Sequence, residues 1–440
     1  MADETADHRA DLGTRHGRRQ FLRVAAASTA AAALPGLHPR RAAAQRARTL
    51  KIGYVSPQTG PLAGFGETDS FVVAGIRKAV GKGLSVRGAS MPVEILVRDS
   101  QSDPNRAAEV ASRLILSDKV DLMLVSSTPE TTNPVSDQCE ANGMPCISSV
   151  CPWQPWFFGR GGKPETGFKS TFHFFWGLED IIGVFVDMWS TLPTNKVVGA
   201  LWPNDGDGNA WSDAQRGFPP ALAKAGYKLV DPGRYPNLTD DFSAQISAFK
   251  KDNVEIVTGV PIPPDWTTFW KQAAQQGFKP KIATVGKALL FPRSVEALGN
   301  LGDGMSTEVW WTPRHPFKSS LTGASAADLA AAYTKDTKKQ WTQPLGFTHA
   351  LFEVAVDVLK RTASPDDKGA IVTAIRATDL NTVVGPVSWA KGPVPNVTKT
   401  PLVGGQWGRG KEFRFDVTIV SNRAAPSIPA SGKLRPIGQA

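Results

Sequence analysis

The chain has 440 residues, which is long enough for two domains that each bury a hydrophobic core. Hydrophobic residues make up 41% of it and charged residues 20%, a composition typical of a globular protein that excludes a large disordered block. The formal net charge is +10, yet the basic residues are spread along the chain and form neither a Lys/Arg-rich block nor a basic helix. We therefore expect no nucleic-acid partner.

The first 44 residues have the layout of an export signal. The basic segment RRQFLR at 18–23 precedes an Ala-rich apolar run at 24–34, and three alanines at 42–44 provide small residues for cleavage. The arginine pair resembles a twin-arginine signal, although Gly17 stands where Ser or Thr is usual. The apolar run is too short to remain as a membrane anchor. The sequence thus predicts a signal peptide over 1–44 and a soluble mature protein outside the cytoplasm.

Strands and helices alternate from residue 50 onward. Short apolar runs and capping residues predict strands at 50–55, 93–97, 120–125 and 144–148, and helices at 67–80, 103–116 and 129–141. Asp103-Pro104, for example, combines a capping side chain with a proline in the first helical turn. Alternation at this spacing indicates a doubly wound α/β lobe with a parallel sheet.

The segment 121–152 carries the first candidate site. Its first strand ends at Ser126-Ser127-Thr128, directly before the predicted helix, and its second strand ends at Ser148-Ser149. Hydroxyls together with free backbone N–H groups at a helix start form an anion-binding site. We expect this segment to form one wall of a ligand-binding cleft.

The strand and helix pattern repeats after a looser Gly- and Pro-containing segment at 152–167. It predicts strands at 171–175, 196–201, 227–230, 254–258 and 281–284, and helices at 179–190, 211–225, 239–251 and 264–276. This indicates a second α/β lobe. The remainder differs, because a strand at 305–311 and helices at 324–341, 346–360 and 365–377 precede short Gly- and Pro-rich strands between 382 and 419.

The sequence offers no motif for metal binding or catalysis. The histidines after residue 44 do not stand at metal-ligand spacing, and the segment NDGDGN at 204–209 lacks the spacing and closing Glu of a calcium loop, so we expect a turn there. No Gly-x-Ser-x-Gly motif occurs and no Ser/His/Asp set is suggested, which argues against a hydrolase. We expect no catalytic residue, no metal and no cofactor.

The cysteines leave the disulfide question open. There are three, Cys139, Cys146 and Cys151, and an odd number in an exported chain leaves at least one unpaired. A bridge between Cys151 and one of the other two is compatible with the sequence, and so are three buried free thiols.

The order of these pieces resembles the periplasmic solute-binding proteins of branched-chain amino-acid type ABC transporters, which have the type I periplasmic-binding fold. The likeness covers roughly residues 49 to 420. Five stretches carry it: IGYVSPQTGPLAGFGE, RDSQSDPNRAAEVASRLILSDKVDLML, VSSTPETTNPVSDQCEANGMPCISS, VVGALWPNDGDGNAW and PIPPDWTTFWKQAAQQGFKPKIATVG.

The resemblance implies an α/β protein of two Rossmann-like lobes joined by three crossovers, with the ligand in a central cleft at the carboxyl ends of the strands. We place the crossovers near Phe174, near Val285 and at 378–384. Lobe 1 is then expected over 49–173 plus 286–379 and lobe 2 over 174–285 plus 380–440. Hinge closure would trap the ligand.

The resemblance also implies which residues contact the ligand. In this family, Ser and Thr hydroxyls of the first lobe hold the ligand's carboxylate, and Ser127, Thr128, Ser148 and Ser149 match those turns. An acidic group near the second crossover commonly takes the amino-acid ammonium, but that position here is Lys287. A cation does not favour an ammonium, so the sequence favours a ligand with an additional anionic or neutral polar group.

Further candidates lie in the loops that face the expected cleft. Phe65 occupies the first loop, where the family often places an aromatic side chain over the ligand. Thirteen tryptophans is a high number, and those at strand ends can stack on a flat or apolar ligand. The remaining candidate contacts are Trp153, Trp176 and Trp310, with Asp207, Asn209 and Asp265 on the opposing wall.

The resemblance predicts a periplasmic binding protein that delivers a small organic solute, such as a carboxylate or an aromatic acid, to an ABC permease in the inner membrane. We expect the binding protein itself to be a monomer. A branched-chain amino acid or amide is the alternative ligand. A sensor of the same fold is the alternative role, and an exported enzyme has less support because nucleophile and metal motifs are missing.

Overall fold

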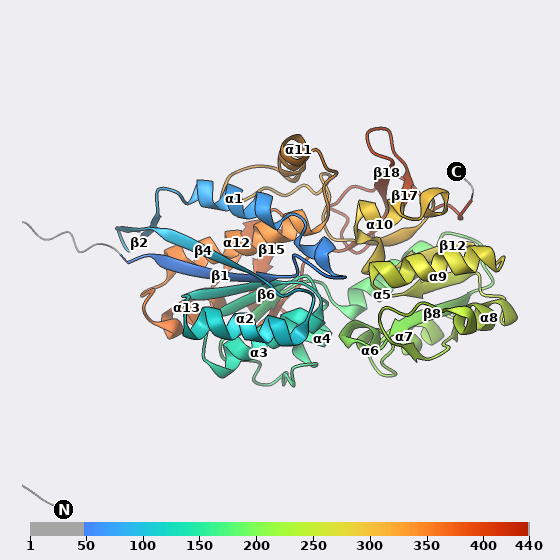
Figure 1. The fold of residues 1–440 in the computed structure, drawn as a ribbon, viewed down its shortest axis with the longest axis horizontal. Coiled ribbons are helices and arrows are strands. Elements are labelled where there is room, and N and C mark those ends of the chain that lie inside the picture. The colour runs from blue at the N-terminus through green and yellow to red at the C-terminus, as the bar shows by residue number, and fades with distance from the viewer. Residues whose placement is uncertain (1–47, 439–440) are drawn as a thin grey trace, which may run out of the picture. The chain divides into compact units, whose positions relative to one another are not determined.

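The structure, a computed structural model, describes residues 48–438. Its first large sheet has six parallel strands in the order β16-β7-β6-β5-β1-β4 (Figure 1). These strands are β1 (Leu50–Ser56), β4 (Val93–Asp99), β5 (Leu122–Ser126), β6 (Cys146–Ser149), β7 (Thr171–Phe174) and β16 (Val397–Thr398). The central strands β5 and β6 are buried along their whole length, as expected for a parallel sheet with helices on both faces.

Helices cover both faces of this sheet and together with it form lobe 1. They are α1 (Asp69–Ala79), α2 (Pro104–Leu116), α3 (Pro129–Ala141), α4 (Trp153–Phe157), α11 (Ala326–Thr337), α12 (Pro344–Arg361) and α13 (Lys368–Arg376). Successive residues of β1 point to opposite faces. Val55 packs with α2 and α3, whereas the Tyr54 ring lies 5.3 Å from the ring of Phe352 in α12. Two hairpins complete the lobe: β2 (Leu84–Val86) with β3 (Ala89–Met91), and β14 (Asp379–Thr382) with β15 (Gly385–Ser388).

The second large sheet follows the order β10-β8-β11-β12-β13-β17-β18, with β9 beside β8, and forms lobe 2 with its helices. Its strands are β8 (Val197–Pro203), β9 (Lys228–Val230), β10 (Arg234–Tyr235), β11 (Ile256–Gly259), β12 (Ile282–Val285), β13 (Ser306–Val309), β17 (Val403–Arg409) and β18 (Phe415–Ser421). Its helices are α5 (Leu178–Ser190), α6 (Gly206–Trp211), α7 (Phe218–Lys224), α8 (Ser243–Lys251), α9 (Pro263–Gln275) and α10 (Pro292–Glu296). β17 and β18 are antiparallel to their neighbours, and the other strands are parallel.

Four short 3-10 helices lie in the connections. They are η1 (Ala63–Gly66), η2 (Ala288–Leu290), η3 (Gly299–Gly302) and η4 (Trp389–Lys391). η1 and η2 matter for the site, because they place loops of lobe 1 and lobe 2 at the facing edges of the two sheets.

The chain passes between the two lobes three times: after β7, after β13 and after β16. Two of these passages differ from the predicted positions. Residues 286–309 stay with lobe 2 because β13 pairs with β12 and β17. Residues 380–398 stay with lobe 1 because β14 packs on α12 and β16 pairs with β7. The pairing partners of these short strands decide which lobe a segment belongs to. These partners cannot be read from the local sequence.

Two local predictions were wrong. The helix predicted over 211–225 is interrupted, because α6 ends at Trp211 and α7 begins at Phe218. The turn predicted at 204–209 is instead the start of α6, where the Asp205 carboxylate caps the helix by accepting a hydrogen bond from the Gly208 N–H at 2.7 Å. In addition, the loose segment at 152–167 contains the short helix α4. The expected α/β class with two lobes is confirmed.

The remaining features concern the surface and the thiols. Cys139, Cys146 and Cys151 are buried and free, so none of the conceivable bridges is present.

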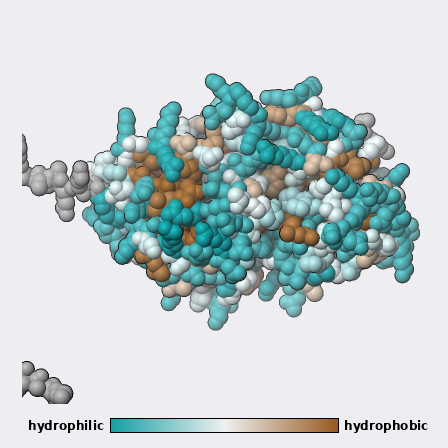
Figure 2. All heavy atoms as spheres, viewed as in Figure 1, coloured by the Kyte–Doolittle hydropathy of each residue, from teal (hydrophilic) through white to brown (hydrophobic). Residues whose placement is uncertain are grey.

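Between residues 48 and 438, no helix combines the length and apolar character needed to cross a membrane. The predicted signal peptide lies outside the described residues. Figure 2 shows a mostly polar face with an apolar patch over β4 and α1.

Candidate ligand-binding site

A small cavity, which we call the inner cavity, lies where the carboxyl ends of the strands in the two lobes meet. Its free volume is about 20 Å³, roughly enough for one water molecule. Six of the predicted site residues line it: Phe65, Thr128, Trp176, Asp207, Lys287 and Trp310. Sequence reasoning missed the other lining residues: Val150, Pro152, Phe175, Trp211, Val260, Leu290 and Glu308.

Five of the thirteen residues that line the inner cavity are aromatic. The Phe175 ring lies 4.7 Å from the ring of Trp176 and 5.3 Å from that of Trp310. On the lobe 2 side, the Trp211 ring stacks on Phe218 at 5.0 Å. The indole N–H groups of Trp176, Trp211 and Trp310 are buried and have no hydrogen-bond partner in the described part of the chain. The aromatic residues of the wall therefore contribute both apolar surface and three N–H donors without a partner in the described residues.

The two hydroxyl-rich turns differ in the state of their hydroxyls. The Ser148 hydroxyl donates to the Phe172 carbonyl oxygen at 3.1 Å, and the Ser149 hydroxyl donates to the Phe174 carbonyl oxygen at 2.7 Å. By contrast, the buried hydroxyls of Ser127 and Thr128 have no partner among residues 48–438. Thr128 also stands at the N-cap of α3, and its carbonyl oxygen accepts from the N–H groups of Thr131 and Thr132. The available polar groups are therefore concentrated at Ser127 and Thr128.

Lys287 is paired within the protein. Its Nζ lies 2.8 Å from Asp207 Oδ2 and 3.1 Å from Asp205 Oδ2, and each of the three side chains is 4% exposed. The expectation that Lys287 offers an uncompensated positive charge was wrong. Two carboxylates that are about 80 residues away in sequence face the one ammonium, so the group of three carries a net negative charge when all are ionised.

The backbone at Lys287 is strained. Its φ is +58° and its ψ is −60°, and the Ala288 N–H donates to the Gly286 carbonyl oxygen at 2.5 Å, as in a γ-turn of the rare hand. The Lys287 N–H donates to Glu308 Oε1 at 3.0 Å, which holds the turn against β13. A Cβ at position 286 would lie 2.6 Å from the Trp211 ring, so glycine is needed for this close approach. Strain of this kind is concentrated at functional sites.

The pKa values of Asp207, Glu308 and Lys287 are all shifted from their ordinary values. Desolvation raises the pKa of Asp207 to about 7, with Glu130 and Asp205 adding to the rise and Lys287 opposing it. Desolvation likewise raises the pKa of Glu308 to about 7. Burial opposes the charge of Lys287, but Asp205, Asp207 and Glu130 outweigh it and raise the pKa of Lys287 well above its usual range. Asp207 and Glu308 are therefore the carboxyl groups of this cluster that gain or lose a proton near neutral pH, while Lys287 stays charged.

The other predicted contacts lie outside the inner cavity. The Trp153 indole N–H donates to Glu179 Oε1 at 3.2 Å, and its ring packs on Phe157 and Phe158. Asn209 is exposed and lines a separate groove of about 420 Å³. Asp265 is buried and accepts a hydrogen bond from the Leu238 N–H at 3.0 Å, and burial raises its pKa to about 7.

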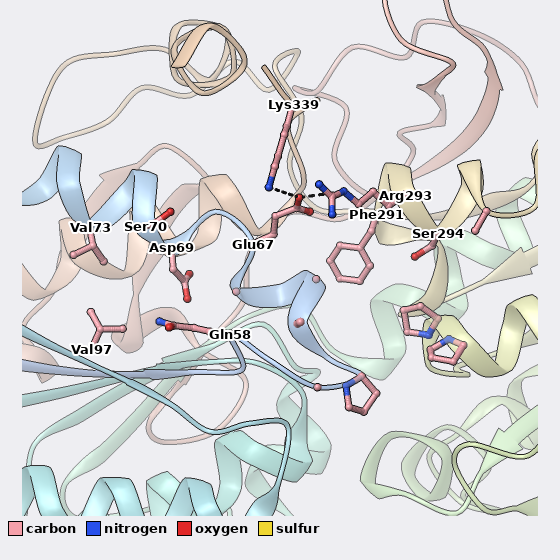
Figure 3. Close-up of a pocket in the computed structure, with 18 of the residues that line it drawn as sticks. Gln58, Glu67, Asp69, Ser70, Val73, Val97, Phe291, Arg293, Ser294 and Lys339 are labelled. Atoms are coloured by element: carbon pink, nitrogen blue, oxygen red, sulfur yellow. Dashed lines mark hydrogen bonds and ion pairs between the residues drawn. The ribbon is translucent and has the colours of Figure 1, made fainter. Parts of the chain in front are cut away.

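A much larger groove, the outer groove, adjoins the inner cavity and has a volume of about 1120 Å³. Its lining residues include Gln58, Asp69, Pro263, Phe291, Arg293 and Lys339 (Figure 3). Glu67 lies 3.5 Å from Arg293 and 3.2 Å from Lys339, and Figure 3 shows it between them. The Phe291 ring meets the Phe65 ring edge-on at 5.0 Å. Because Phe65 lines the inner cavity and Phe291 the outer groove, this pair forms the wall between them.

The lobes are in contact around the inner cavity. The Gly206 N–H at the start of α6 donates to Glu130 Oε1 in α3 at 2.7 Å. The Arg216 guanidinium lies 4.3 Å from the centre of the Phe158 ring. Both contacts join lobe 1 to lobe 2, so the structure is a closed form. No group of three or more His, Cys, Asp or Glu residues within 48–438 is arranged to hold a metal ion.

The sequence matches a family model described as periplasmic binding protein over residues 49–405. The chain therefore belongs to the periplasmic binding protein family, which confirms the resemblance noted from the sequence. The members of this family are binding proteins, and the cavity between two lobes fits a solute-binding role.

Solved structures show the same fold at low sequence identity. A leucine-binding protein, LivK, from Thermotoga maritima matches with a TM-score of 0.69 and 20% identity, covering 85% of this chain and 99% of that one. The branched-chain amino-acid binding protein LivJ from Streptococcus pneumoniae, in complex with isoleucine, matches at 0.66 and 15%, covering 84% and 99%. An ABC transporter solute-binding protein from Rhodopseudomonas palustris BisB5, in complex with 3,4-dihydroxybenzoic acid, matches at 0.67 and 16%, covering 86% and 99%.

Proposed function

We propose that this protein is the substrate-binding component of an ABC importer, exported to the periplasm, where it hands a small organic solute to a permease in the inner membrane. The periplasmic binding protein family and the ABC-transporter origin of a structural relative support this role. The protein acts as a monomer and carries out no chemistry of its own, because translocation is the work of the permease and its ATPase.

One observation carries the proposal. Four residues that line the inner cavity carry a buried polar group without a partner in the described part of the chain: the hydroxyl of Thr128 and the indole N–H groups of Trp176, Trp211 and Trp310. A buried donor left unpaired costs about 1–3 kcal/mol, so a folded protein keeps several of them together where a ligand can satisfy them. These donors suit a ligand group with oxygen acceptors, and the rings suit a flat or apolar body.

Ligand entry requires the lobes to separate. The closed cavity holds roughly one water molecule, so no solute of amino-acid size enters it without a movement about the three crossovers. Closure over the solute would then bring Glu130 onto Gly206 and exclude bulk water. The bound ligands of the structural relatives, isoleucine and 3,4-dihydroxybenzoic acid, indicate the size range to search.

Thermal-shift screening of the purified protein tests the proposal. The panel comprises amino acids, aromatic acids, dicarboxylates, amides and amines, and a ligand that binds the folded state raises the melting temperature. Thr128→Val should weaken the binding of any hit about 5- to 20-fold by removing one hydroxyl. Thr131→Val is the matched control, since its buried hydroxyl also lacks a partner but does not line the cavity. A panel without a single stabilising solute would contradict the proposal.

A further inference from the structure

Asp207 has the one carboxylate oxygen in the inner cavity lining that lacks a partner among residues 48–438. Its Oδ2 accepts from Lys287, whereas its Oδ1 is buried and accepts no hydrogen bond. Both oxygens of Glu308 are engaged, by the Lys287 N–H and by the Thr307 hydroxyl at 2.8 Å. The site therefore offers a ligand a single free anionic acceptor.

The two acids next to Asp207 are engaged elsewhere, Asp205 through both of its oxygens and Glu130 through Oε1. Asp205 Oδ1 accepts from the Gly208 N–H at 2.7 Å, and its Oδ2 accepts from Lys287 and, at 3.1 Å, from the Asn237 amide. Glu130 accepts from Gly206 across the lobes. Asp205, Asp207 and Glu130 all favour the charged form of Lys287, so three carboxylates act on one ammonium at this end of the cavity.

This balance determines the ligand charge that the site favours. An anionic group beside Lys287 would also meet Asp205, Asp207 and Glu308 in a desolvated setting, where repulsion is weakly screened. A cationic group would instead complete the pairing of Asp207. The rings of Phe65, Trp176, Trp211 and Trp310 add attraction, because aromatic faces stabilise a desolvated cation.

We infer that Asp207 determines specificity by binding a positively charged group of the solute, a protonated amine or a quaternary ammonium, while Lys287 is a positioning residue. Lys287 holds Asp207 Oδ2 and is itself held by the strained turn on Glu308, so Oδ1 stays available in the cavity. The inference rests on the proposed binding function and adds the charge of the ligand. It reverses the expectation drawn from Lys287 in the sequence.

Probes of equal shape and different charge test this inference. Benzylamine, benzyl alcohol and benzoate share one ring and carry positive, zero and negative charge. Choline and 3,3-dimethylbutan-1-ol form a second matched pair. Titration calorimetry, together with the fluorescence of the cavity tryptophans, should show that the cations bind at least 10-fold more tightly than their neutral and anionic counterparts.

Variants then assign the preference to Asp207. Asp207→Asn should weaken cation binding about 10- to 100-fold and leave the neutral probes within a few-fold. The matched control is Asp69→Asn, because Asp69 is equally buried but lies in the outer groove and is paired with Tyr54 and Ser56. It should leave the charge preference intact.

The outcomes separate the two proposals. Tighter binding of benzoate or benzyl alcohol than of benzylamine would overturn the charge assignment but keep the binding function. Cation binding unchanged in Asp207→Asn would overturn the role of Asp207. Failure of every probe to bind would count against both the charge assignment and the cavity as a ligand site.

Discussion

The inner cavity and the outer groove both lie between the lobes, but the ion pairs of the groove are exposed to solvent whereas those of the cavity are buried. In the outer groove, Arg293 and Lys339 are 68% and 43% exposed while pairing with Glu67, so water and salt screen those pairs. In the inner cavity, Lys287 and its two aspartates are 4% exposed. The groove is far larger, yet the small cavity is lined by Lys287 with its strained backbone and by Trp176, Trp211 and Trp310, whose indole N–H groups have no partner within residues 48–438. The burial of charged residues therefore identifies the candidate ligand site in this protein better than the volume of a compartment does.

The largest expected effect is on stability, when the lysine ammonium of the inner cavity is removed and the result is compared with removal of a lysine ammonium in the outer groove. Lys287→Met would leave Asp205 and Asp207 buried without their cation, which should lower the free energy of unfolding by about 3–5 kcal/mol. Lys339→Met breaks a solvent-screened pair and should cost at most about 1 kcal/mol. Urea unfolding of both variants measures the difference. Equal losses would mean that depth does not set the strength of these pairs.

Asp69 sharpens the comparison, since it lines the outer groove yet is only 2% exposed. Burial raises its pKa to about 7, against hydrogen bonds from Ser56 and Tyr54 that lower it. A carboxyl whose folded pKa is raised stabilises the fold below its unfolded pKa, near 4, and loses that stability as pH rises to about 7. Asp69→Asn should therefore gain up to about 4 kcal/mol relative to the parent between pH 4 and pH 8.

Unfolding curves of the parent and of Asp69→Asn at several pH values measure this gain. The exposed Asp336, changed to Asn, serves as the control and should give parallel curves. Parallel curves for Asp69→Asn as well would mean that this carboxyl ionises as freely as one in water.

The pH dependence of ligand affinity tests the role of Asp207 in the inner cavity separately from the outer groove. Asp207 faces Lys287, Asp205, Glu130 and Glu308, and its pKa is raised to about 7. Choline keeps its charge at every pH, so its affinity should rise about 10-fold from pH 6 to pH 8 as Asp207 loses its proton. An anionic ligand would show the opposite slope. Calorimetric titrations measure the slope, which Asp207→Asn should flatten and Asp69→Asn should preserve.

The smallest expected effect concerns the wall between the two compartments. Phe291→Leu removes the edge-on contact with Phe65 but keeps an apolar side chain. An aromatic pair is worth about 0.5–1.5 kcal/mol, so ligand dissociation should accelerate about 2- to 10-fold. Stopped-flow tryptophan fluorescence with benzylamine measures the rate. An unchanged rate would show that this wall is not on the exit path.

The lobes could be predicted from sequence because their strands and helices are local patterns. Asp103-Pro104 starts α2 as expected, and its carboxylate accepts from the Arg106 N–H at 2.7 Å. The apolar run at 120–125 is strand β5. The second and third crossovers were misplaced because β13 and β16 pair with strands far away in sequence. A strand of two to four residues is too short to show a clear hydrophobic periodicity.

The site was predicted in part for the same reason. Phe65 and Trp310 follow or precede recognisable elements, so their place at the cleft could be inferred. Asn209 was misplaced because α6 is a helix, in which residues two apart point about 200° away from each other, so Asp207 turns inward and Asn209 outward. The pairing of Lys287 depends on tertiary contacts that no local pattern encodes.

The hydrogen bond from Gly206 to Glu130 links the order of a helix to the position of a lobe. α6 has six residues, and one of its first N–H groups is satisfied by a side chain of the other lobe. Separation of the lobes would break this hydrogen bond, expose the Gly206 N–H to solvent and make the helical turn that carries Asp207 less stable. The amide proton of Gly206 should consequently exchange with deuterium slowly in the closed state and quickly in the open one. The exchange rate of this one amide proton therefore reports how often the lobes separate.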